Sequence, residues 1–153
     1  MSSGGSGSPM PGLLPDVKLI DLDVAWRERE TEAAALLTAG YDSLALALRL
    51  YALEIRIKGI ICMQLRLSYL PRACKIHDLA EFIVFSGIWE ELEDPANDAI
   101  RQNWDLLVRF SKARLNDLRY LPRAAVDPAE SRRIYEALDD PKEGVLAWLS
   151  RHH

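Results

Sequence analysis

Five polar side chains between positions 109 and 123 recur at spacings of three and four residues. We call them the basic stripe: Arg109, Lys112, Asn116, Arg119 and Arg123. This spacing places them on one face of a helix, opposite its apolar face. A row of cations of this kind could bind the phosphates of a nucleotide or of RNA. The same pattern is also explained by a solvated helix face, whose positive charge would balance the negative charge of the acidic segment before it. Both interpretations stay open.

Three further cations, Arg49, Arg56 and Lys58, lie in the most apolar part of the chain. An unpaired charge is expensive to bury, so each must form an ion pair, reach the surface or line a cleft. Glu54 lies four residues before Lys58, the order that favours an ion pair on a helix. Together with the basic stripe, Arg56 and Lys58 are candidate residues for binding a nucleotide or nucleic acid.

His77 is the only histidine away from the C-terminus. An imidazole that is oriented in a cleft can act as a general acid or base. His77 is therefore a candidate catalytic residue, and Asp78, which follows it, could instead cap a helix. The sequence contains no nucleophile elbow, phosphate loop or dinucleotide fingerprint.

Two cysteines, Cys62 and Cys74, are separated by twelve positions with no zinc-binding pattern. Cys62 lies in an apolar run, which is typical of a packed thiol. We therefore expect no metal and no cofactor. Reduced cysteines favour a cytoplasmic location.

The positions of glycine and proline predict the elements that carry these side chains. The chain has 153 residues with 8 glycines and 8 prolines, and four of these glycines and three of these prolines fall within residues 1–15. Their scarcity elsewhere predicts an all-α fold, an up-and-down bundle of four or five main helices. We expect a flexible leader over 1–15, native or left from cloning, one helical domain over 16–150, and a tail over 151–153 that could belong to a purification tag. No apolar stretch is long enough for a membrane helix.

Individual helices are predicted from periodicity and from the residues that end them. The first stops at Gly40 and is either one helix or two. Pro71 ends the second, and the third starts at Asp78. A break at Pro141 divides the last helix. The expected ranges are 16–39, 41–68, 78–87, 89–94, 98–121 and 128–149.

Charge is distributed in blocks along the chain. The formal net charge is −4, but residues 76–108 carry −7 between two segments, 41–75 and 109–123, of +4 each. The two basic segments could form one cationic surface. Alternatively, the basic stripe could pair with the acidic residues 90–94, as in a structural oligomerisation module.

Several short segments, in this order and spacing, resemble the HEPN domain, a small helical module of prokaryotic toxin–antitoxin and defence systems. The similarity covers about residues 25–150. It is carried by Ala33 to Leu37 with Tyr41, by Leu50-Tyr51-Ala52-Leu53-Glu54 with Lys58, by His77-Asp78-Leu79, and by Arg119-Tyr120-Leu121-Pro122.

The resemblance implies a bundle of four or five helices, commonly a homodimer, often paired with a minimal nucleotidyltransferase. Many members are metal-independent endoribonucleases with an Arg-x4–6-His motif on a late helix at the dimer interface. Here Arg114 and Arg119 have that spacing, but the second position holds arginine, which stays protonated and is a poor base. Arg72 and His77 have the spacing in an earlier segment, which we interpret as a chance match. The resemblance adds Arg114, Arg119 and Tyr120 to His77 as candidate catalytic residues.

The favoured hypothesis is a HEPN-like protein that binds a nucleotide or RNA, or pairs with a nucleotidyltransferase, without strong catalysis. One alternative is an active metal-independent endoribonuclease toxin. The other is the oligomerisation module.

Overall fold

The chain, represented by a computed structural model, is described over residues 17–152. Regular structure in this range is helical, apart from one isolated bridge between Lys18 and Tyr69. This confirms the predicted all-α bundle. The α-helices are α1 (Leu19–Thr38), α2 (Asp42–Gln64), α3 (Leu79–Phe85), α4 (Trp89–Glu93), α5 (Asp98–Tyr120), α6 (Pro128–Asp139) and α7 (Val145–Leu149), with short 3-10 turns at Arg72–Cys74, Pro95–Asn97 and Arg123–Ala125.

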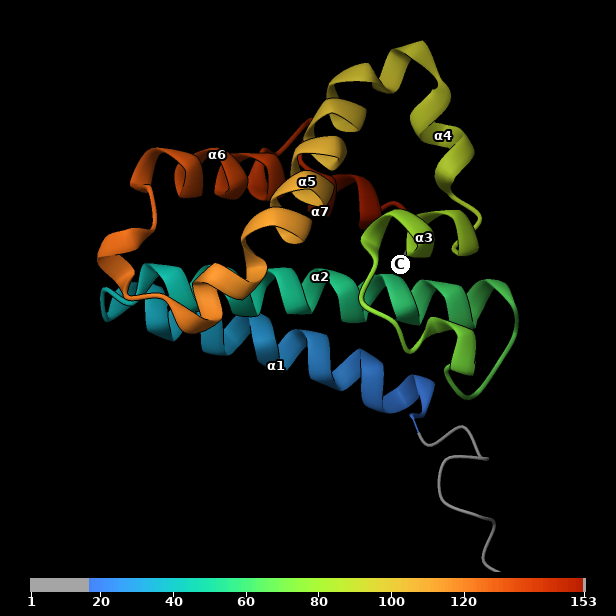
Figure 1. Cartoon of the computed structure of the whole chain (residues 1–153). Helices are drawn as coiled ribbons and strands as arrows, with labels where there is room; N and C mark the ends of the chain where they lie inside the picture. The colour runs from blue at the N-terminus through green and yellow to red at the C-terminus, as the bar shows by residue number, and fades with distance from the viewer. Residues whose placement is uncertain (1–16, 153) are drawn as a thin grey trace, which may run out of the picture.

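Helices α1 and α2 form a long antiparallel hairpin that underlies the rest of the molecule (Figure 1). The turn between them uses Gly40, whose φ of +87° is a conformation that glycine adopts without strain. The first helix is a single one, Leu19–Thr38, and it ends just before Gly40, as predicted. The predicted leader, residues 1–15, lies outside the described residues.

Helix α2 is the centre of the core. Leu46, Leu53, Ile57 and Ile61 are completely buried along it, because α1 packs on one side and α3, α5 and α6 pack on the other. Cys62 is a fully buried thiol, as predicted, and burial raises its pKa.

The end of α2 differs from the prediction. It lies at Gln64 rather than near residue 68, and Pro71 does not cause it. Arg66 takes a left-handed φ of 54°, and the amide of Leu67 donates to the carbonyl of Cys62 at 2.8 Å. These are the marks of a Schellman motif, which here uses arginine where glycine is usual.

Helix α5 crosses over α2 (Figure 1) and buries Trp104, Leu107 and Phe110. Helices α3 and α4 connect the two long helices at one end, and α6 and α7 follow α5. Asp78 caps α3, as predicted, since its Oδ1 accepts from the amide of Ala80 at 3.0 Å.

Arg49 ties three helices together. Its guanidinium, on α2, forms a bidentate ion pair with the Asp139 carboxylate at the end of α6. Its Nε lies 2.8 Å from Oε2 of Glu30 on α1. The Arg49 side chain is only 13% exposed. Within residues 17–152, no helix combines the length and apolarity needed to cross a bilayer.

Candidate functional site

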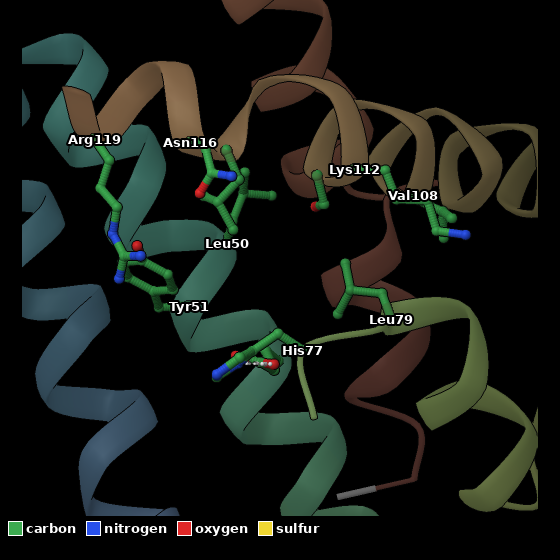
Figure 2. A pocket seen from close by; sticks show the side chains of 11 residues that line it. Leu50, Tyr51, His77, Leu79, Val108, Lys112, Asn116 and Arg119 are labelled. Carbon is green, nitrogen blue, oxygen red and sulfur yellow. Dashed lines mark hydrogen bonds and ion pairs between the residues drawn. The ribbon is translucent and has the colours of Figure 1, made fainter. Parts of the chain in front are cut away.

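A cavity of about 160 Å³ lies between α2, α5 and the segment that leads into α3 (Figure 2). We call it the α2–α5 cavity. Its walls mix leucine and valine side chains with groups that can bind a ligand. It is lined by Leu50, Tyr51, Glu54, His77, Leu79, Val108, Ser111, Lys112, Leu115, Asn116 and Arg119.

Glu54 contributes the carboxylate of the cavity. Its side chain is 12% exposed, and its Oε1 lies 3.5 Å from Nζ of Lys58. The predicted ion pair on α2 is therefore confirmed. Lys58 itself is buried with its ammonium 4.7 Å from the centre of the Phe82 ring, so it neutralises Glu54 without lining the cavity.

His77 lies at the cavity mouth with its side chain 80% exposed. Its Nδ1 is 2.9 Å from Oε1 of Glu54. Because an ionised carboxylate only accepts hydrogen bonds, Nδ1 is the donor, and Nε2 of the neutral ring is then an acceptor. The Asp78 cap fixes the backbone that follows His77, and the contact with Glu54 orients the imidazole.

Three members of the basic stripe line the opposite wall, on successive turns of α5: Lys112, Asn116 and Arg119. The Arg119 guanidinium lies over the Tyr51 ring, 5.6 Å from its centre (Figure 2). Nζ of Lys112 is 4.0 Å from Oδ2 of Asp78. These side chains lie at the edge of the apolar face of α5, beside Val108. The spacing had predicted that they lie opposite the apolar face. They line the cavity because α5 crosses α2 at that edge.

Two hydroxyl groups in the cavity wall lack a partner. Tyr51 Oη and Ser111 Oγ are buried and have no hydrogen bond within the described residues. Buried polar groups are normally satisfied, so these two atoms mark a place for water or a ligand. In the sequence, Ser111 interrupts the apolar pattern of α5. That interruption is the only sequence feature that could have indicated Ser111 as a site residue.

The remaining stripe residues do not line the cavity. Arg109 is exposed one turn earlier on α5, where it lines a different surface hollow. Arg123 lies beyond the end of α5, where its guanidinium donates to the carbonyl of Gly40 and lies 6.0 Å from the centre of the Tyr41 ring.

Two candidate catalytic residues also lie away from it. Arg114 pairs with Asp117 at 3.1 Å and with Glu130 at 3.7 Å on another side of α5. Tyr120 is 76% exposed at the end of that helix. Only His77 and Arg119 of the candidate catalytic set share the cavity.

Arg56 occupies a separate place. Its guanidinium lies 4.5 Å from the centre of the Trp26 ring, and Nη2 donates to Oγ of Ser150 at 3.2 Å. Burial lowers its pKa. The side chain packs α2 against α1 and the C-terminal residues, and it does not reach the cavity.

No match to this chain is found among known protein families, curated proteins or solved structures. Function must therefore be argued from the cavity itself. Among residues 17–152, no cluster of three or more His, Cys, Asp or Glu side chains could hold a metal ion. What the cavity offers is cationic and amide donors at the rim, an oriented imidazole and inward hydroxyls, a set suited to binding a phosphorylated ligand.

Proposed function

We propose that this chain is a HEPN-like protein that binds a nucleotide or RNA at the α2–α5 cavity. The observation that supports this most is the convergence of Lys112, Asn116 and Arg119 from α5 with His77 from a distant loop. They surround a cavity whose buried hydroxyls have no hydrogen-bond partner among residues 17–152.

The charges of the cavity support an anionic ligand. Lys112 and Arg119 contribute two cations, and Glu54 is held by Lys58 and His77. A phosphate at the rim would meet guanidinium, ammonium and amide donors, while the buried carboxylate is already compensated.

Binding is tested by fluorescence anisotropy with a short labelled RNA and with unlabelled nucleotide monophosphates as competitors. We expect affinity to fall as salt rises, and the salt slope to drop by about 0.7 for each phosphate contact removed in Lys112→Ala or Arg119→Ala. Arg133→Ala, an exposed cation on α6, is the matched control. Equal affinity in all four proteins would contradict the proposal.

The Glu54–His77 contact favours a second candidate function, metal-independent RNA cleavage. Nε2 of His77 takes the proton of a ribose 2′-hydroxyl while its oxygen bonds to the adjacent phosphorus. The bond from phosphorus to the 5′-oxygen breaks, and that oxygen takes the proton back from the imidazolium, leaving a 2′,3′-cyclic phosphate and a 5′-hydroxyl. Lys112 and Arg119 would stabilise the charge that grows on the phosphoryl oxygens.

Incubation of RNA with the pure protein in EDTA tests this second function. If His77 is the base, cleavage is lost in His77→Ala and reduced in Glu54→Gln. Loss of cleavage in Arg114→Ala, with His77→Ala active, would instead assign the reaction to the arginine pair of α5. No cleavage by the unaltered protein leaves binding as the function.

The same proposal includes a toxin–antitoxin or defence role, a homodimer and pairing with a minimal nucleotidyltransferase, which rest on the resemblance to HEPN domains. It also includes a cytoplasmic location, which rests on the two cysteines. Exposed apolar side chains at the end of α5 and at the α1–α2 turn, among them Tyr120, Leu121, Tyr41 and Leu44, offer a surface for a partner. Sedimentation equilibrium distinguishes a monomer from a dimer.

A further inference from the structure

The inner part of the α2–α5 cavity is lined by apolar side chains and hydroxyl groups, whereas its rim carries the cations. This difference indicates which kind of nucleotide the cavity binds. We infer that the cavity admits a single-ring base, so that the ligand is a pyrimidine nucleotide or a pyrimidine within RNA. The inference rests on the proposed function and adds a substrate class to it.

The first argument is size. The cavity measures about 160 Å³, and an apolar cavity of about 150 Å³ holds one benzene ring. A pyrimidine is a single six-membered ring with small polar substituents, whereas a purine has two fused rings. The cavity therefore fits the smaller base.

The second argument is the chemistry of the walls. Leu50, Leu79, Val108 and Leu115 offer hydrocarbon to the faces of a flat ring. Tyr51 Oη and Ser111 Oγ are buried there, and neither bonds to another group in the part of the chain that the structure describes. Each hydroxyl can both donate and accept. Two such groups can bond the polar edge of uracil or of cytosine, so we expect no strong preference between these two bases.

The third argument is the position of the charges. Lys112 directly follows Ser111 on α5, Arg119 lies about two turns beyond it, and the Arg119 guanidinium lies over the Tyr51 ring. A base that bonds the Tyr51 and Ser111 hydroxyls thus leaves its sugar phosphate beside the two cations. The base would therefore fill the cavity, and the phosphate would lie at its rim.

Calorimetric titration of the full chain with UMP, CMP, AMP, GMP and ribose 5-phosphate tests the inference. We expect UMP and CMP to bind at least about tenfold more tightly than AMP and GMP, the effect of losing two neutral hydrogen bonds. Tyr51→Phe and Ser111→Ala should each weaken UMP binding about three- to tenfold and leave ribose 5-phosphate binding unchanged. Tyr69→Phe, on an exposed ring beside Lys18, is the matched control and should bind UMP normally.

The free variants provide a second readout. Both substitutions remove a buried hydroxyl that has no partner, so Tm of the ligand-free variants should stay equal or rise. A lower Tm together with unchanged UMP affinity would assign the hydroxyls to the fold and overturn the inference.

Failure of the inference can be told apart from failure of the proposed function. Equal binding of UMP and AMP, with no effect of Tyr51→Phe, overturns base insertion but leaves nucleotide binding in place. Binding of none of the five ligands and of no RNA overturns both.

Discussion

Nδ1 of His77 lies 2.9 Å from Oε1 of Glu54, a residue 23 positions earlier on α2. The same oxygen is 3.5 Å from Nζ of the buried Lys58. One carboxylate thus compensates a core cation and orients the imidazole at the cavity mouth, which links the stability of α2 to the geometry of the site.

Glu54→Gln should lower the free energy of unfolding by about 1.5–3 kcal/mol, because it leaves the Lys58 ammonium without its charged partner. Lys58→Met replaces that ammonium by an apolar chain. In the double variant the loss should be smaller than the sum of the single losses, since no buried charge is left unpaired. Urea unfolding of the four proteins measures the coupling, and strictly additive losses would contradict the arrangement.

Arg49→Ala should destabilise the bundle by about 1.5–3 kcal/mol, because Glu30 and Asp139 lose the cation that joins α1, α2 and α6. Arg29→Ala is the control. Its ion pairs with neighbours on α1 are exposed, so it should cost about 0–1 kcal/mol. Thermal unfolding monitored by circular dichroism separates the two, and similar losses in both variants would refute the role of Arg49.

Asp78→Ala should remove the cap of α3 and cost about 0.5–2 kcal/mol, whereas Asp78→Asn should retain most of that stability. Amide hydrogen exchange at Ala80 and Glu81 reports the cap directly, since both amides donate to Asp78. Exchange that stays slow in the alanine variant would show that the cap does not hold this helix end.

The buried phenol of Tyr135 should make the stability of the fold depend on pH in the alkaline range. Burial, partly offset by Arg49, raises the pKa of its phenol to about 12, from an ordinary value of 10.0. The fold favours the neutral phenol, so this contribution to stability is complete below pH 10 and is lost as pH rises from 10 towards 12. Phenolate absorbance should show a tyrosine near 12 that is missing in Tyr135→Phe. Titration of that tyrosine near 10 would contradict the burial.

The helical fold could be predicted from the sequence because its signals are local. Gly40, Asp78 and Pro128 each mark a helix boundary through their own backbone or side-chain chemistry, and the structure places boundaries there. The end of α2 could not be predicted in the same way. It depends on Arg66 in a left-handed conformation, which arginine rarely adopts and no local pattern indicates.

The cavity was predictable only in part. Helical spacing placed Lys112, Asn116 and Arg119 on one surface, but which side of α5 faces α2 depends on the packing of the core. His77 belongs to a loop without periodicity, and its contact with Glu54 arises from the tertiary fold. The roles proposed for Tyr51 and Ser111 follow from hydroxyls that are buried with no hydrogen-bond partner among the described residues, a property that the sequence does not display.

The central claim is that the α2–α5 cavity binds nucleotides, and an NMR titration of the uniformly ¹⁵N-labelled full chain with UMP tests it most directly. We predict saturable amide shifts at residues 50–54, 77–79 and 108–119, with little change in α6 and α7. Shifts confined to other parts of the chain, or no shifts at millimolar UMP and with a short RNA, would contradict the account.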